Sequence, residues 1–138
     1  MKCIIDTHLL IWLAVVPEKI SKVILEIIEN PENKIFVSTV NLWEIAIKLS
    51  LKKLDLQNLD IDDLVDMCCE QGLEIIQLPI AAVKKYRNLP VKERHKDPFD
   101  RLLISLCIAG DYVFLSSDSK GGQYKADGLR FIKKIKDM

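Results

Sequence analysis

The sequence predicts an α/β fold, a three-layer α/β/α sandwich with a central, mostly parallel sheet. Short apolar runs of strand length alternate along the chain with segments in which apolar residues recur at helical spacing. Each intervening helix supplies the crossover that parallel neighbours need, and helices then cover both faces of the sheet. The 138 residues have the size of one domain, so we expect a single domain over residues 1–138.

In the first half of the chain, the expected elements carry local signals. An apolar run of strand length opens the chain and ends at Asp6. Ser21 can cap a helix through its side-chain oxygen, and Gly72 can end another. The helix after the second strand begins at either Ser38 or Asn41. The expected elements are strand 2–6, helix 7–15, helix 21–29, strand 34–37, helix 38–51 and helix 60–71.

The second half continues the alternation. Asp97 directly precedes Pro98, which is the arrangement of a helix cap followed by proline at the first helical position. Gly110 is expected to end that helix. The expected elements are strand 73–78, helix 80–87, loop 88–96, helix 97–109, strand 112–116, loop or short helix 119–125 and edge strand 129–132.

Charge is balanced overall but unevenly distributed. The chain has 20 Lys and Arg against 20 Asp and Glu, which argues against a protein that wraps nucleic acid by bulk charge alone. From Asp55 to Glu74 there are seven acidic residues and no Lys or Arg, whereas residues 84–101 are rich in Lys and Arg. Such segments are either solvated faces or, for the basic one, a rim that grips phosphates near Asp100.

The sequence indicates a cytoplasmic protein without a membrane partner. Its longest apolar run, residues 9–16, is too short to span a bilayer. Asp6 and His8 interrupt the segment where a signal peptide would need an apolar stretch.

The cysteines are expected to be structural. Their surroundings in the sequence are apolar, and no two form a C-x-x-C pair, which disfavours zinc or redox chemistry. In a reducing compartment such residues behave as buried small hydrophobes. The four are Cys3, Cys68, Cys69 and Cys107.

Four carboxylates stand beside apolar sequence, where an ionised group is costly unless something compensates it. Asp6 and Asp118 lie at or just past the ends of expected strands, and Glu44 lies in the helix that follows another strand. Because ligands of parallel sheets bind beyond the carboxyl ends of the strands, these three side chains could face one crevice. Asp100 would approach it from the side. Such a cluster suits a hard divalent cation.

Each carboxylate also has an ordinary structural explanation. Asp6 could simply cap the helix that follows it. Glu44 could form a capping box with Asn41, three residues earlier, or an ion pair with Lys48, four residues later. Asp118, among serines, could be a turn residue.

Asp97 and Asp100 compete for one place in the site. Asp97 is a helix cap by position. Asp100 then takes the third helical position, on the same face as Leu103 and Ile104, where a carboxylate needs a partner. We therefore expect Asp100 to belong to the acidic set and keep Asp97 as the fallback.

Three blocks of the sequence, in this order, resemble the main motifs of PIN-domain proteins. The closest subgroup is the VapC-type toxins of bacterial and archaeal toxin–antitoxin pairs. The parts most specific to that subgroup are Trp-Glu-Ile-Ala in the second block and Asp-Pro-Phe-Asp-Arg-Leu in the third. The blocks are DTHLLIWL at 6–13, STVNLWEIAIK at 38–48 and HKDPFDRLLI at 95–104.

The resemblance implies a PIN-like fold and a divalent-metal-dependent endoribonuclease that hydrolyses RNA phosphodiester bonds with Mg²⁺ or Mn²⁺. Its catalytic and metal-binding set would be Asp6, Glu44, Asp100 and Asp118. Two metal ions close together could activate the attacking water and stabilise the leaving oxygen. The alternative is a non-catalytic PIN-like module that binds RNA or protein.

The resemblance also implies partners. A free ribonuclease endangers its own cell, so a cognate antitoxin is expected, and homodimers are usual in the family. The apolar helices around 9–13 and 43–49 offer more apolar surface than a small sheet needs, which fits burial by a partner. The residues expected to contact the RNA substrate are Lys92, Arg94, His95 and Lys96.

Overall fold

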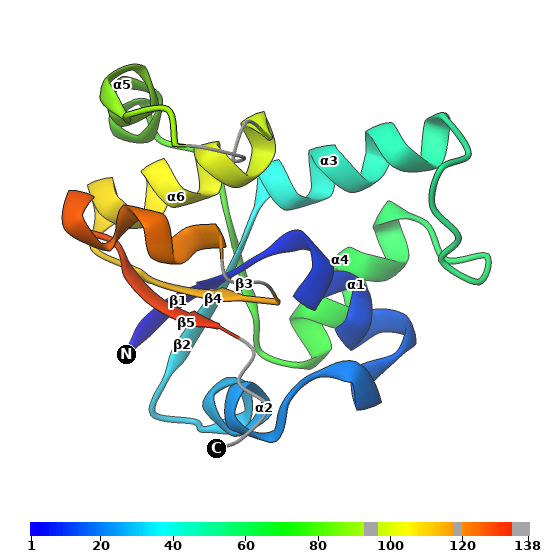
Figure 1. Ribbon diagram of the computed structural model, residues 1–138. Helices are drawn as coiled ribbons and strands as arrows, with labels where there is room; N and C mark the ends of the chain where they lie inside the picture. Colours follow the sequence, from blue (N-terminus) through cyan, green and yellow to red (C-terminus); the bar gives the residue numbers. More distant parts are fainter. Residues whose placement is uncertain (93–96, 118–119, 134–138) are drawn as a thin grey trace.

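A parallel sheet of five strands forms the centre of the computed structural model, which describes residues 1–92, 97–117 and 120–133 (Figure 1). The strand order is β3-β2-β1-β4-β5, and all four neighbouring pairs are parallel. The expected edge strand is present as β5. The strands are β1 (Lys2–Ile5), β2 (Lys34–Ser38), β3 (Glu74–Ile76), β4 (Val113–Ser116) and β5 (Arg130–Lys133).

The strand order creates a switch point in the middle of the sheet. The chain runs from β1 outward to β2 and β3, then returns to lay β4 and β5 on the other side of β1. Cys3 of β1 accordingly pairs with Ile35 of β2 and Val113 of β4. Ligand sites of open parallel sheets lie at such a switch point, beyond the carboxyl ends of the strands. Here that place is the junction between the ends of β1 and β4.

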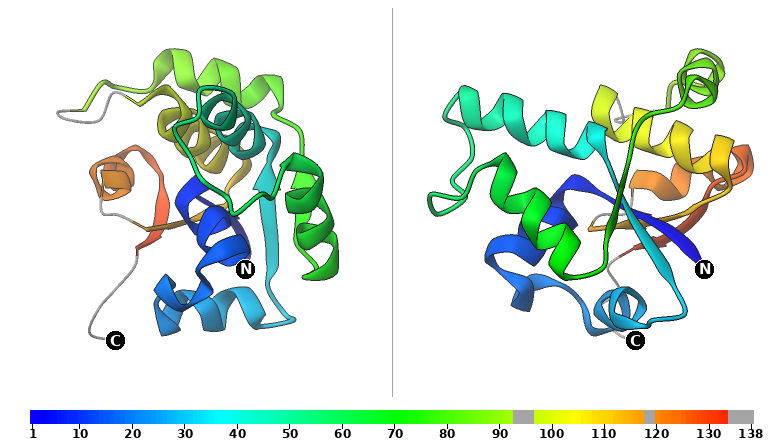
Figure 2. Two further views of the ribbon diagram at one scale, coloured as in Figure 1. Left: turned by 90° about the vertical axis from the view of Figure 1, so that its right-hand side faces the viewer. Right: turned by 180° about the vertical axis from the view of Figure 1, so that it is seen from behind.

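Helices cover both faces of the sheet, as predicted (Figures 1 and 2). Helices α1, α2 and α4 lie on one face, and α6 and η2 lie on the other, with α5 packed outside α6. Helix α3 starts at the carboxyl end of β2. The helices are α1 (Thr7–Val15), η1 (Pro17–Lys19), α2 (Lys22–Glu29), α3 (Thr39–Ser50), α4 (Ile61–Glu70), α5 (Ile80–Asn88), α6 (Pro98–Gly110) and η2 (Lys120–Asp127).

Alternation along the strands produces the two cores. Cys3 and Ile5 point into the core on the α1 side, whereas Ile4 points into the core on the α6 side. Successive side chains of a strand lie on opposite faces, so a continuous apolar strand feeds both layers. None of the described helices combines the length and apolar character that a membrane span needs.

The cap of α3 resolves the choice between Ser38 and Asn41. The Ser38 hydroxyl accepts a hydrogen bond from the backbone N–H of Val40 at 3.0 Å. The Asn41 side chain in turn accepts one from the backbone N–H of Ser38 at 2.8 Å. Ser38 is therefore the cap and Asn41 its capping-box partner, so the capping box proposed for Asn41 with Glu44 is wrong.

The end of α6 also differs from the prediction. Gly110 is the last helical residue rather than the residue that stops the helix, and Asp111 takes the left-handed position with φ 57°. A side chain at Gly110 would lie closer than 3.0 Å to the Tyr112 ring. That ring packs edge-to-face on Phe36 with centroids 5.3 Å apart. Glycine is used here for close packing, and not for a positive φ.

The expectation that all cysteines are buried is wrong for one of them. Cys3, Cys68 and Cys107 are buried free thiols, whereas Cys69 is exposed on α4. Burial raises the pKa of Cys68 to about 11, which keeps this thiol protonated and unreactive at neutral pH.

The sequence predicts exposed apolar surface on both α1 and α3, but only α3 has it. The large apolar residues of α1 belong to the core, because α1 is enclosed by the sheet and by its neighbouring helices. On α3, by contrast, Trp43 is 58% exposed. The buried residues of α1 are Thr7, Leu9, Leu10, Ile11 and Leu13.

Candidate active site

Asp6 lies at the switch point and joins the ends of β1 and β4. The residue is 3% exposed. Oδ1 accepts a hydrogen bond from the backbone N–H of Leu9 at 2.8 Å, so Asp6 caps α1. Oδ2 accepts three more, from the Ser116 hydroxyl at 2.8 Å and from the Ser117 N–H and hydroxyl at 2.7 and 3.0 Å. The explanation of Asp6 as a helix cap is therefore correct. The same residue is also a buried carboxyl group at the junction where parallel sheets commonly bind ligands.

The surroundings of Asp6 disfavour its charge. Burial raises the pKa of this carboxyl above its ordinary value, and the donated hydrogen bonds offset only part of that effect. A cation beside the carboxylate would supply the missing compensation.

Glu44 is the second buried carboxylate of this region, 3% exposed on α3. The Thr7 hydroxyl donates to its Oε1 at 2.7 Å, and the Lys48 ammonium donates to its Oε2 at 2.9 Å. The predicted ion pair with Lys48 is therefore present. Because Thr7 directly follows Asp6, this hydrogen bond links Glu44 of α3 to the start of α1, next to Asp6.

Asn41 completes this link. Its side-chain N–H₂ group donates to the Thr7 hydroxyl at 3.1 Å and to the carbonyl of Ile5 at 3.3 Å. Asn41 is fully buried, and its oxygen accepts from Ser38. The start of α3 is thereby fixed to the end of β1, which sets the place of Glu44.

The start of α6 brings Asp97 and Asp100 to the start of α3, and the two helix starts lie side by side in both figures (Figures 1 and 2). Asp97 is exposed and caps α6, accepting from the backbone N–H of Phe99 at 2.9 Å, as predicted. Asp100 is half-buried in the first turn. The Phe99 ring contacts Trp43 edge-to-face, with centroids 5.3 Å apart. The residues preceding Asp100 and Glu44 are therefore in contact.

The donor set suits a hard cation. Asp6 and Glu44 offer buried carboxylate oxygens, and Asp6 Oδ1 accepts one hydrogen bond where a carboxylate oxygen can accept about two. Within the described residues, no three His, Cys, Asp or Glu side chains are grouped closely enough to hold a metal, so Asp6, Glu44 and Asp100 do not form a ligand cluster by themselves. Asp118, the fourth expected ligand, lies outside those residues. The residues that could hold Mg²⁺ or Mn²⁺ are Asp6, Glu44, Asp100 and Asp118.

The basic residues expected to contact RNA are described only in part. The Lys92 ammonium lies 3.0 Å from Asp127 Oδ2 and 5.6 Å from the centre of the Tyr124 ring. Lys92 therefore binds η2, in addition to any contact that its positive charge makes with RNA. Arg94, His95 and Lys96 lie outside the described residues.

Arg101 belongs to the basic segment 84–101, for which the sequence predicts a solvated face or a rim that grips phosphates, but its guanidinium is buried. It donates to the carbonyls of Leu89 and Pro90 at 3.2 and 3.0 Å and to the Tyr124 hydroxyl at 3.0 Å, and it lies 5.2 Å from the centre of the Tyr86 ring. It thus ties the segment after α5, and η2, to the helix that carries Asp100. A charged residue within an apolar helix was the available signal.

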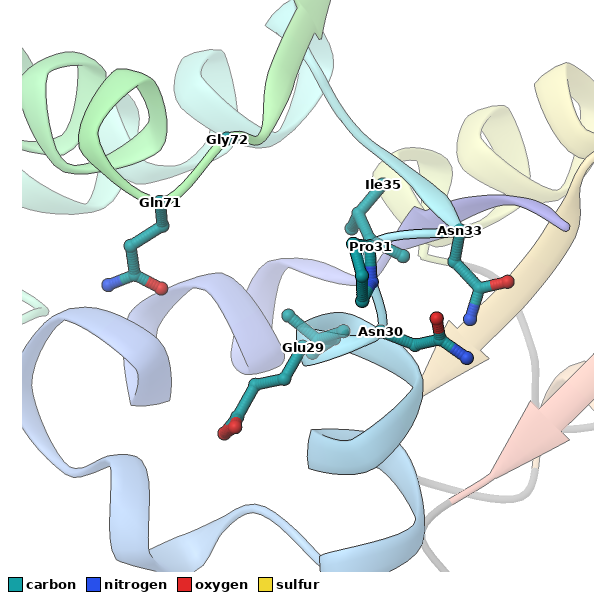
Figure 3. A pocket seen from close by; sticks show the side chains of 8 residues that line it. Glu29, Asn30, Pro31, Asn33, Ile35, Gln71 and Gly72 are labelled. Carbon is teal, nitrogen blue, oxygen red and sulfur yellow. The ribbon is translucent and has the colours of Figure 1, made fainter.

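A hollow of about 580 Å³ lies near the amino ends of β2 and β3, between the ends of α2 and α4 (Figure 3). Two of its polar side chains, Asn30 and Asn33, form hydrogen bonds within the protein. The Asn33 amide donates to the Ile27 carbonyl at 3.0 Å, and the Asn30 oxygen accepts from the Glu32 N–H at 2.9 Å. This hollow offers no chemistry comparable to the buried acids at the switch point.

The sequence matches a known protein family, and the fold matches solved structures. Residues 3–129 match the family model described as the PIN domain. No protein of curated function matches the sequence.

Three solved structures illustrate the shared fold. A chain of VapBC2 from Rickettsia felis, bound to a promoter DNA fragment, has a TM-score of 0.66 at 18% identity, with 96% of this chain and 98% of that chain covered. DNA-bound VapBC from Salmonella typhimurium has a TM-score of 0.64 at 14% identity, with 98% of this chain and 99% of that chain covered. VapBC-1 from nontypeable Haemophilus influenzae has a TM-score of 0.60 at 12% identity, with 96% of this chain and 98% of that chain covered. At these identities the match concerns the fold.

Proposed function

Because the chain belongs to the PIN-domain family, we propose that it is a divalent-metal-dependent endoribonuclease and the toxin of a toxin–antitoxin pair. The observation that carries the proposal is the junction at the switch point, where Asp6 and Glu44 are both buried and Thr7, the residue after Asp6, donates a hydrogen bond to Glu44. Burial disfavours the charge of Asp6, and the carboxylate oxygens of both residues are the type of ligand that a hard cation prefers. The fold shared with VapBC structures supports the toxin assignment.

The reaction is the attack of water on an RNA phosphodiester in line with the leaving oxygen. The chemistry that Mg²⁺ or Mn²⁺ supplies when bound is activation of that water and neutralisation of charge on the phosphate. Asp6 and Asp100 would hold the ion most tightly, and Glu44 and Asp118 would complete the set or hold its waters. Thr7 orients Glu44 for this task.

RNA would reach the site across the basic segment after α5. Lys84 and Arg87 are exposed on α5, and the sequence between α5 and α6 contributes further positive charge. Counterion release from the phosphates would favour binding there. The residues of that sequence proposed to contact RNA are Lys92, Arg94, His95 and Lys96.

The proposed partners are a cognate antitoxin, which would block the site in the cytoplasm, and a second copy of the single-domain chain. Large apolar side chains are exposed on and just beyond α3 and α5, which supports burial by another copy. They are Trp43, Leu51, Ile80, Val83 and Val91.

RNA cleavage by a matched pair of variants tests the catalytic assignment. We expect a circular single-stranded RNA to be cut in Mg²⁺ or Mn²⁺ and to stay intact in excess EDTA. Asp100→Asn should slow cleavage at least about 100-fold, because a charge that stabilises the transition state is lost. Asp97→Asn should be nearly silent, because Asn caps a helix as well as Asp.

The opposite result for the pair would move the catalytic role to Asp97.

The alternative of a non-catalytic PIN-like binding module has one observation in its favour, since both oxygens of Glu44 are already engaged by Thr7 and Lys48. RNA binding without any cleavage in either metal would establish that alternative.

A further inference from the structure

We propose that Lys48 is a positioning residue whose ammonium holds and neutralises Glu44 in the metal-free protein, so that a divalent cation must compete with it for Glu44 Oε2. The inference rests on the proposed function, because it requires the cation to bind at this site. It assigns to Lys48 the control of how tightly the site takes up its metal.

The contact is asymmetric in burial. The Glu44 side chain is 5% exposed and fixed from the other side by Thr7, whereas the Lys48 side chain is 37% exposed. Glu44 therefore stays in place, and the flexible Lys48 stem can carry its charge into water. A lysine ammonium is a strongly hydrated point charge on a long chain, which suits such a release.

The burial of Glu44 also distinguishes this pair from an ordinary helical ion pair. Exposed pairs four residues apart contribute little, because water already stabilises both charges. Removing Lys48 instead leaves a buried carboxylate without its counter-ion, which is costly. The cost disappears once another cation sits beside Glu44. Lys48 is therefore expected to stabilise the metal-free fold and to weaken metal binding.

Lys48→Met separates these two effects. It keeps a long, flexible side chain but removes the charge. With Mn²⁺ alone as the probe, calorimetry should show about three- to tenfold tighter binding than in the wild type, because a unit positive charge next to a divalent cation is removed, partly screened by salt. Thermal melting in EDTA should show a lower Tm for Lys48→Met, and saturating Mn²⁺ should remove most of that difference.

Three further variants complete the design. Lys48→Arg keeps the charge and should bind Mn²⁺ like the wild type. Lys53→Met, at an exposed lysine just beyond α3, removes the same charge without breaking the 2.9 Å contact of Lys48 with Glu44, and it should also resemble the wild type. Lys48→Gln keeps a hydrogen-bond donor without the charge, and it should bind Mn²⁺ more tightly even where Lys48→Met fails to fold.

The outcomes distinguish the inference from the proposed function. A wild type that binds no Mn²⁺ would overturn both, because the proposed metal site would be absent. A wild type that binds Mn²⁺, with Lys48→Met and Lys48→Gln binding it equally or more weakly, would overturn only the inference. An equal gain in Lys53→Met would show a general effect of net charge and would also overturn it.

Discussion

Replacing Thr7 with valine should destabilise the protein through a single lost hydroxyl. Valine has nearly the shape of threonine, so the substitution creates no cavity. It removes the 2.7 Å hydrogen bond to Glu44 and the oxygen that accepts from Asn41 at 3.1 Å. Asn41 keeps its contact with the Ile5 carbonyl, so the loss falls mainly on Glu44.

The magnitude follows from the charge on Glu44. A hydrogen bond to a charged group contributes about 1.5–3 kcal/mol, and leaving a buried acceptor unsatisfied has a cost of the same order. We therefore expect Thr7→Val to lower the free energy of unfolding by about 2–3 kcal/mol. For a chain of this length, that corresponds to a drop in Tm of about 8–12 °C.

Urea unfolding in EDTA, followed by circular dichroism, measures this loss directly. The slope of the unfolding free energy against urea should stay unchanged, since the variant exposes the same surface on unfolding. Thr7→Ser is the matched control, because it keeps the hydroxyl and removes only a methyl group, at about 1 kcal/mol. If Thr7→Val costs less than Thr7→Ser, the hydroxyl does not hold Glu44 and the reasoning fails.

Two further predictions concern the surroundings of the site. Arg101→Met should lower the free energy of unfolding by about 3 kcal/mol, because two carbonyls and the Tyr124 hydroxyl lose a charged donor. Urea unfolding measures this loss, and a variant as stable as the wild type would contradict the prediction. Arg94→Gln combined with Lys96→Gln should weaken RNA binding and make the binding constant depend less steeply on salt concentration, because fewer counterions are released. An unchanged salt dependence would mean that these residues belong to a solvated face. Lys92 is left intact because it also contacts Asp127.

The elements of this fold could be predicted because their signals are local. Ser21 accepts from the backbone of Ile24, and Asp97 caps α6 ahead of Pro98, as the sequence indicates. The alternation of strand and helix likewise specifies a parallel sheet with two covered faces. Boundaries differ by one or two residues, as helix ends commonly do.

The contacts of the site could not be predicted, because they depend on strand order. The hydroxyl of Ser116 reaches Asp6 across 110 positions of sequence only because β4 lies next to β1. Sequence alone placed both near the ends of strands, without saying which strands are neighbours. Thr7 and Asn41 were visible as polar residues beside the carboxylates, but their role depends on the approach of α3 to the end of β1.

Periodicity also failed to tell a core helix from a partner surface. Helix α1 is apolar around most of its circumference, which is typical of a helix enclosed on several sides as well as of one that awaits a partner. The tertiary structure encloses α1 and leaves Trp43 of α3 exposed. Only the packing of the other layers decides between these outcomes.

The central claim is that a divalent cation binds among the carboxylates at the switch point. A crystal of the protein soaked in Mn²⁺ and measured for anomalous scattering tests it most directly. The account predicts a peak within about 2.0–2.6 Å of carboxylate oxygens from Asp6 and Asp100, with Glu44 bound directly or through water. A saturated crystal without a peak at these residues, or with its peak at other carboxylates, would contradict it.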